Sequence, residues 1–299
     1  MAITMEDGGG GMRVLTLAGE DGSGFLTTAA LGQLAAALRA LAADAGLRVL
    51  LVRGNPGMFC RGRIGAKGLT RASDVAEDLR AILQVNDTLD ALPAPVVAAV
   101  EGEALGFGFG LTAQSDYAVA AEDAVLALPE MSHGLPPLVV LSYLTRFVPY
   151  KRAFELAVTS RRIGASEALA AGVVTEVVPP GQAVARGMEV ARGMASHDAR
   201  TVALLRRFSR HAAGVHSAHL SEHAVSLMSV LLAERAQDQA TGGAAHRPDA
   251  AATAVGDAPA GQAGDELTHP ERAQSRHVHA GQAGAAHPHA APPQPMQAL

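Results

Sequence analysis

The sequence has few of the features that mark disulfide-stabilised, membrane-spanning or nucleic-acid-binding proteins. Its one cysteine, Cys60, cannot form an internal disulfide, which fits a reducing compartment. No apolar run reaches the length of a membrane span, and the first twelve residues lack the basic and apolar regions of a signal peptide. The formal net charge of −5 gives no basic surface for nucleic acid. We therefore expect a cytoplasmic protein without nucleic-acid or membrane partners.

Aromatic side chains make up only 3% of the 299 residues, so Ala, Leu and Val must fill the core. Apolar residues reach 48%, which is enough for one sizeable globular unit. Residues 239–299 differ in composition: they are rich in Ala, Gly, Pro, Gln and His and lack Phe, Tyr, Trp and Ile. Such a segment cannot bury enough apolar surface to offset its ordering entropy, so we expect a disordered tail. Its histidines have no fixed geometry, and no metal site is predicted.

Strand-like and helical stretches alternate between the two ends of the chain. Strands are predicted at residues 13–18, 49–52, 96–100, 117–121 and 124–128. One helix is predicted to begin at Thr27 or Thr28, and others to span residues 73–92, 138–147, 181–196, 199–212 and 217–236. This order predicts an α/β core at residues 12–198 and a helical region at 199–238. Residues 1–11, with glycine at positions 8 to 11, are predicted to be flexible.

The most informative segment is the glycine-rich turn within residues 95–110. An apolar strand ends there, and the turn leads into a helix predicted at residues 111–115 and closed by Asp116. The start of a helix presents free backbone N–H groups and a partial positive charge, which suit a carbonyl oxygen that becomes anionic during a reaction. A dinucleotide fingerprint is the competing interpretation of Gly106-x-Gly108. It is disfavoured because Leu111 stands where the third glycine should be.

The pattern Gly102-x-Ala-Leu-Gly-x-Gly108 resembles the crotonase (enoyl-CoA hydratase/isomerase) superfamily. Three further segments match that family in the same order, at residues 49–62, 126–136 and 153–179. The resemblance implies an α/β fold, a crotonase-like spiral of ββα units with a C-terminal helical region. It also implies an acyl-CoA thioester substrate, no cofactor other than the coenzyme A of that substrate, and a homotrimer or dimer of trimers that residues 199–238 build.

The resemblance assigns an oxyanion hole to the backbone N–H groups of Arg63 and Phe107. Losing one such donor typically costs about 3–4 kcal/mol of barrier. Other residues expected around the substrate are Cys60, Arg61, Gly62, Lys67, Gly106, Gly110 and His133. Members of the family usually have a small or apolar residue where Arg63 stands. Its guanidinium is expected to reach a CoA phosphate, to narrow the pocket or to remain exposed and unpaired.

Glu130 is the strongest candidate for the proton carrier. It follows Pro129 at the end of an apolar strand, where burial would raise its pKa towards the working pH, and it matches the second catalytic glutamate of the family. Without the resemblance, a solvated or capping glutamate would be the commoner interpretation. His133 either orients this base, acts as a second acid or is an ordinary loop histidine. Cys60 has no triad around it and is expected to be a buried filler.

The first catalytic glutamate of the family falls on Gly110, which has no side chain to hold water. One retained glutamate is similar to the pattern of Δ3-Δ2-enoyl-CoA isomerases, so isomerisation is preferred. The alternatives are an enoyl-CoA hydratase, a related lyase or decarboxylase, and a non-catalytic acyl-CoA-binding subunit. Basic residues at 206, 207 and 210 either meet the 3′-phosphate of CoA or form a solvated helix face.

Overall fold

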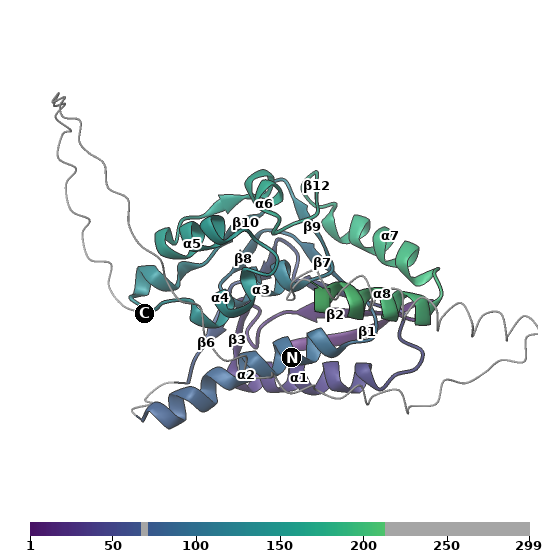
Figure 1. Ribbon diagram of the computed structural model, residues 1–299, viewed down its shortest axis with the longest axis horizontal. Coiled ribbons are helices and arrows are strands. Elements are labelled where there is room, and N and C mark those ends of the chain that lie inside the picture. Colours follow the sequence, from purple (N-terminus) through teal and green to yellow (C-terminus); the bar gives the residue numbers. More distant parts are fainter. Residues whose placement is uncertain (67–70, 213–299) are drawn as a thin grey trace, which may run out of the picture. The chain divides into compact units, whose positions relative to one another are not determined.

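A mainly parallel sheet is the base of the fold (Figure 1). The computed structural model describes residues 1–66 and 71–212. In that part of the chain, six strands form this sheet in the order β1 (Ile3–Gly9), β2 (Met12–Leu17), β4 (Val49–Gly54), β7 (Val96–Val100), β9 (Tyr117–Ala121) and β12 (Glu176–Val178). The β1–β2 pair is antiparallel, and every other neighbouring pair is parallel.

Shorter strands continue the chain away from this sheet. They form one sheet in the order β11 (Ile163–Gly164), β10 (Val125–Ala127), β8 (Glu103–Leu105) and β5 (Met58–Cys60), and a pair of β3 (Phe25–Thr27) with β6 (Gly62–Ile64). A long strand, a short strand and a helix therefore recur along the chain, as in β7, β8 and α3 (Phe107–Gln114). This repetition confirms the predicted spiral of ββα units.

Helices cover both faces of the main sheet. The remaining helices are α1 (Thr28–Ala42), α2 (Ala72–Ala91), the 3₁₀ turn η1 (Pro129–His133), α4 (Leu138–Leu144), α5 (Tyr150–Thr159), α6 (Ala165–Ala171), α7 (Ala183–Ala195) and α8 (Ala199–Ala212). Alternate residues of β4 and β7 point to opposite faces: Leu50 and Val96 join the core with α1 to α4, while Leu51 and Val97 pack against α7. Because both faces are buried, these strands read as continuous apolar runs.

The prediction of a flexible segment at residues 1–11 is wrong. Residues Ile3–Gly9 form β1, which pairs with β2 from Ile3 opposite Leu17 to Gly9 opposite Met12. Gly9, Gly10 and Gly11 have positive φ angles and make the turn of this hairpin. The glycines therefore allow the chain to reverse its direction tightly. The strand before them was not predicted, because its polar residues obscure the apolar pattern of a strand.

The other predicted elements are confirmed with small shifts, except that α3 begins at Phe107 instead of residue 111. Gly106, with a φ angle of 51°, precedes the helix, and α3 runs through Gly108 and Gly110. The predicted helix at 217–236 and the predicted tail at 239–299 lie outside the described residues. Within residues 1–66 and 71–212, none of the helices has the length and apolar character to span a membrane.

Two arginines of α8 tie this helix to the core. Arg206 is buried, and its Nη2 donates to the Leu89 carbonyl at the end of α2 at 2.8 Å while its Nε donates to Asp116 Oδ2 at 2.7 Å. Arg210 donates to the Gln114 carbonyl at 2.6 Å and to Asp116 Oδ1 at 2.9 Å. The suggestion that these two arginines meet a CoA phosphate is therefore wrong, because they satisfy carbonyls left free at helix ends. Asp116 is a structural ligand, as expected.

Arg206→Ala is expected to destabilise the protein by about 3–5 kcal/mol, because it leaves the Asp116 carboxylate and several helix-end carbonyls without their buried partner. Arg207→Ala is the matched control, since Arg207 is exposed on the same helix and should change stability by less than about 0.5 kcal/mol. Urea denaturation followed by circular dichroism measures both. Equal stability of the two variants would contradict a structural role for Arg206.

Candidate active site

Two glycine turns meet at the start of α3. Gly62 has a φ angle of 114°, and a Cβ atom built on it would lie 3.3 Å from the Leu105 carbonyl oxygen and 4.0 Å from the Phe107 nitrogen. The Gly106 N–H donates to the Ala127 carbonyl at 2.9 Å, which fixes the second turn. Phe107 is the first residue of α3, so its amide has no acceptor within the helix. The turns that carry the Arg63 and Phe107 amides are therefore neighbours.

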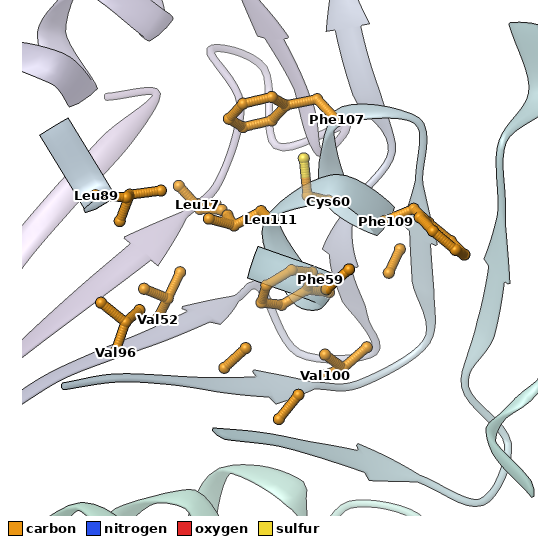
Figure 2. Packing of buried hydrophobic residues seen from close by; sticks show 14 of the residues in the cluster. Leu17, Val52, Phe59, Cys60, Leu89, Val96, Val100, Phe107, Phe109 and Leu111 are labelled. Carbon is orange, nitrogen blue, oxygen red and sulfur yellow. The ribbon is translucent and has the colours of Figure 1, made fainter. Parts of the chain in front are cut away.

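Cys60 lies directly against α3 (Figure 2). A Cβ atom at Gly108 would lie 2.2 Å from the Cys60 carbonyl oxygen, so only glycine permits this approach of helix to strand. Figure 2 shows the Cys60 sulfur between Phe107 and Phe109 of that helix. Burial raises the pKa of the Cys60 thiol to about 12. The thiol therefore stays protonated at neutral pH, as a buried filler would and a nucleophile would not.

The Arg63 side chain is held by residues of α1 and α2. It forms an ion pair with Asp78 of α2 and donates to the Thr28 hydroxyl of α1 at 3.4 Å. Asp78 also accepts from the Ala66 N–H at 3.3 Å. Burial of the Asp78 carboxyl favours protonation, but hydrogen bonds from Thr28 and Arg63 hold its pKa below the ordinary value. The guanidinium is thus paired, so the expectation that it remains exposed and unpaired is wrong. Sequence reasoning missed Asp78 because nothing in α2 marks it.

Of the neighbouring candidates, Arg61 forms an ion pair with Glu103 at 2.6 Å and is exposed. Lys67 lies outside the described residues. His133 is exposed at the end of η1, with Nδ1 3.1 Å from the Pro129 carbonyl oxygen and 3.3 Å from Ser132 Oγ. These contacts stay within its own turn, as in an ordinary loop histidine.

Glu130 lies over the Gly106 turn. A Cβ atom built on Gly106 would be 3.0 Å from Glu130 Oε1, so the carboxylate stands beside the first residue of α3. Oε2 is buried and has no hydrogen-bond partner among the described residues. Burial raises the pKa of the Glu130 carboxyl above its ordinary value, while the charge of His133 opposes the shift. A half-buried carboxyl of this kind can take and return a proton.

Tyr143 of α4 fills the space beside Gly110. A Cβ atom at Gly110 would lie 2.1 Å from the Tyr143 hydroxyl oxygen and 3.4 Å from Val140 Cγ2. The place from which the first family glutamate would extend is therefore occupied by a phenol. Tyr143 was not a candidate because only tertiary packing brings α4 onto α3.

Comparison with known proteins agrees with this fold. Residues 11–239 match the family described as Enoyl-CoA hydratase/isomerase, and the chain belongs to it. The 2,3-dehydroadipyl-CoA hydratase of Escherichia coli is 33% identical over 62% of this chain and 72% of that protein. Carnitinyl-CoA dehydratase of Escherichia coli is 36% identical over 40% of this chain and 46% of that protein. An enoyl-CoA hydratase structure from Mycobacterium smegmatis is 25% identical, with a TM-score of 0.74 over 78% of this chain and 91% of that chain.

Gly108→Ala is expected to disrupt the site, because the new methyl group would meet the backbone carbonyl of Cys60 and push α3 away from β5. We expect a fall of several degrees in melting temperature together with loss of thioester binding. Gly32→Ala is the control: it lies within α1 with open space around it, where alanine typically adds about 0.5–1 kcal/mol of stability. Calorimetry compares the two. A stable, binding-competent Gly108→Ala protein would show that the close approach is dispensable.

Proposed function

We propose that the protein binds an acyl-CoA thioester and stabilises its enolate. The backbone N–H groups of Arg63 and Phe107 form the oxyanion hole, and Glu130 carries the proton. The observation that carries this proposal is the Glu130 carboxylate, half-buried and unpaired at one oxygen beside the free amide of Phe107. The proposal includes no cofactor beyond the coenzyme A of the substrate. We also propose a cytoplasmic homotrimer or dimer of trimers.

Within this chemistry, we propose Δ3-Δ2-enoyl-CoA isomerisation as the main reaction. Glu130 removes a proton from C2, and the C–H electron pair moves into the thioester, where the two amides stabilise the negative oxygen. The same carboxyl then returns the proton at C4, which moves the double bond from C3–C4 to C2–C3. One carboxyl suffices for this transfer. Gly110, covered by Tyr143, supplies no second carboxyl.

Hydration of a 2-enoyl-CoA is the second candidate. The two sequence relatives named above are a hydratase and a dehydratase, and these names indicate addition or loss of water. The unpaired hydroxyl of Tyr143 is the specific feature of this chain that favours it. A non-catalytic acyl-CoA-binding subunit is disfavoured, because such a protein has no use for a buried, unpaired carboxylate.

Glu130→Gln is expected to reduce isomerisation of a 3-enoyl-CoA by about 10²–10⁴-fold, because it removes the proton carrier. Burial disfavours the ionised carboxylate, so above the ordinary glutamate pKa the variant should be at least as stable as the original protein. The control is Glu122→Gln, an exposed carboxylate in the turn after β9.

Mass spectrometry of the products distinguishes isomerisation from added water. We expect isomerisation of the 3-enoyl-CoA to exceed hydration of the matching 2-enoyl-CoA. Faster hydration would overturn the isomerase assignment. Hydration that is also unaffected by Glu130→Gln would overturn the role of Glu130.

A further inference from the structure

Two polar side chains, Glu130 and Tyr143, lie over the same part of α3. Glu130 Oε1 lies over Gly106 and the Tyr143 hydroxyl over Gly110, where Cβ atoms would be 3.0 Å and 2.1 Å away. The Gly110 N–H donates to the Gly106 carbonyl at 3.0 Å, so the two glycines are four residues apart, about 6 Å along the helix axis. The carboxylate comes from η1 and the hydroxyl from α4.

Both groups lack a partner in the part of the chain that the structure describes. Glu130 Oε2 and the Tyr143 hydroxyl are buried without a hydrogen bond, and Tyr143 as a whole is only 7% exposed. A buried hydroxyl without a partner typically costs about 1–3 kcal/mol, and phenylalanine would fill the same space without that cost. The hydroxyl is therefore expected to meet a polar atom that arrives with the substrate.

The two groups have complementary hydrogen-bonding roles. Burial raises the pKa of the Tyr143 phenol. The side-chain amide of Asn86 opposes this shift, although it does not reach hydrogen-bonding geometry with the phenol, and the charge of Glu130 raises the pKa further. Tyr143 therefore keeps its proton and donates. Glu130, once ionised, only accepts. An oxygen that carries a hydrogen can accept from the first group and donate to the second.

We propose that the Tyr143 hydroxyl and the Glu130 carboxylate together bind one oxygen atom at C3 of the acyl chain, as a water molecule or as a hydroxyl substituent. This rests on the proposed function, in which the thioester oxygen lies at the Arg63 and Phe107 amides and the acyl chain passes beside Glu130 and Gly110. Isomerisation then depends on Glu130 alone, whereas addition or loss of water at C3 depends on both groups.

Binding measurements without turnover test whether the two groups bind a hydroxyl substituent at C3 of the acyl chain. The probes are butyryl-CoA and both enantiomers of 3-hydroxybutyryl-CoA, measured by equilibrium dialysis with the bound thioester identified by mass spectrometry. We expect one 3-hydroxy enantiomer to bind more tightly than butyryl-CoA. Tyr143→Phe should reduce that preference about tenfold and keep the affinity for butyryl-CoA within about threefold of that of the original protein. Tyr117→Phe is the matched control, because it removes a hydroxyl held by Glu176 at 2.9 Å against the opposite face of the sheet.

Rates of hydration and isomerisation test whether the two groups bind a water molecule at C3. Tyr143→Phe should lower hydration of crotonyl-CoA about tenfold and change isomerisation less than threefold. Equal effects on both reactions, no effect on hydration, or no hydration by the original protein would each overturn a water-binding role. If Tyr143→Phe weakened the binding of all three thioesters equally, or left the preference for the 3-hydroxy enantiomer unchanged, the proposed binding of a C3 hydroxyl would be overturned.

The outcomes also separate this proposal from the proposed function. Failure of every thioester to bind would overturn the enolate chemistry and this site with it. Binding with the expected preference, but with hydration faster than isomerisation, would support the site and overturn only the isomerase assignment. Tyr143→Phe keeps the volume of the ring and removes an unpaired hydroxyl, so the variant is expected to fold.

Discussion

The approach of α3 to the backbone of Cys60 is the constraint on which the candidate site depends. Glycine at 108 allows the helix to rest on the carbonyl of β5, where a Cβ atom would be 2.2 Å away. That contact places the first amide of α3 beside the Gly62 turn, and it leaves a glycine face on which other elements can set polar groups. Glu130 and Tyr143 both use this face. The first amide of α3, the Glu130 carboxylate and the Tyr143 phenol are thus arranged around one helix that rests on β5.

The network around Asp116 supports the same helix from its other end. Asp116 accepts from the Val96 N–H at 2.8 Å and pairs with Arg206 and Arg210. These contacts join the end of α3 to the start of β7 and to α8. A helix held at both ends presents its N-terminal amides in fixed positions, as stabilisation of a transient oxyanion requires. Arg206 and Arg210 therefore support the site from a distance.

Much of the fold could be predicted from the sequence because buried parallel strands give long apolar runs. The strands at 96–100 and 117–121 were predicted with the bounds that the structure has. β1 was missed because a hairpin turn of glycines resembles a flexible lead-in when its partner strand is unknown. Three-residue strands such as β3 and β8 were missed because they are too short to show a period, whereas β10 was predicted.

The candidate site was predictable only where the chain itself carries the pattern. Glu130 and the glycine turns follow from local motifs, and the structure places them together. Tyr143 and Asp78 lie far along the chain from the residues that they contact, at Gly110 and Arg63, so no spacing in the sequence could indicate them. The side chain of Arg63 was misjudged for the same reason, since its partner lies on a different helix.

The central claim is that the Arg63 and Phe107 amides bind one thioester oxygen beside Glu130. A crystal structure of the protein with butyryl-CoA tests it most directly. We expect a thioester carbonyl oxygen about 2.7–3.1 Å from both backbone nitrogens, with the acyl chain passing between Glu130 and Tyr143. A thioester bound elsewhere, or the two amides facing different surfaces, would contradict it.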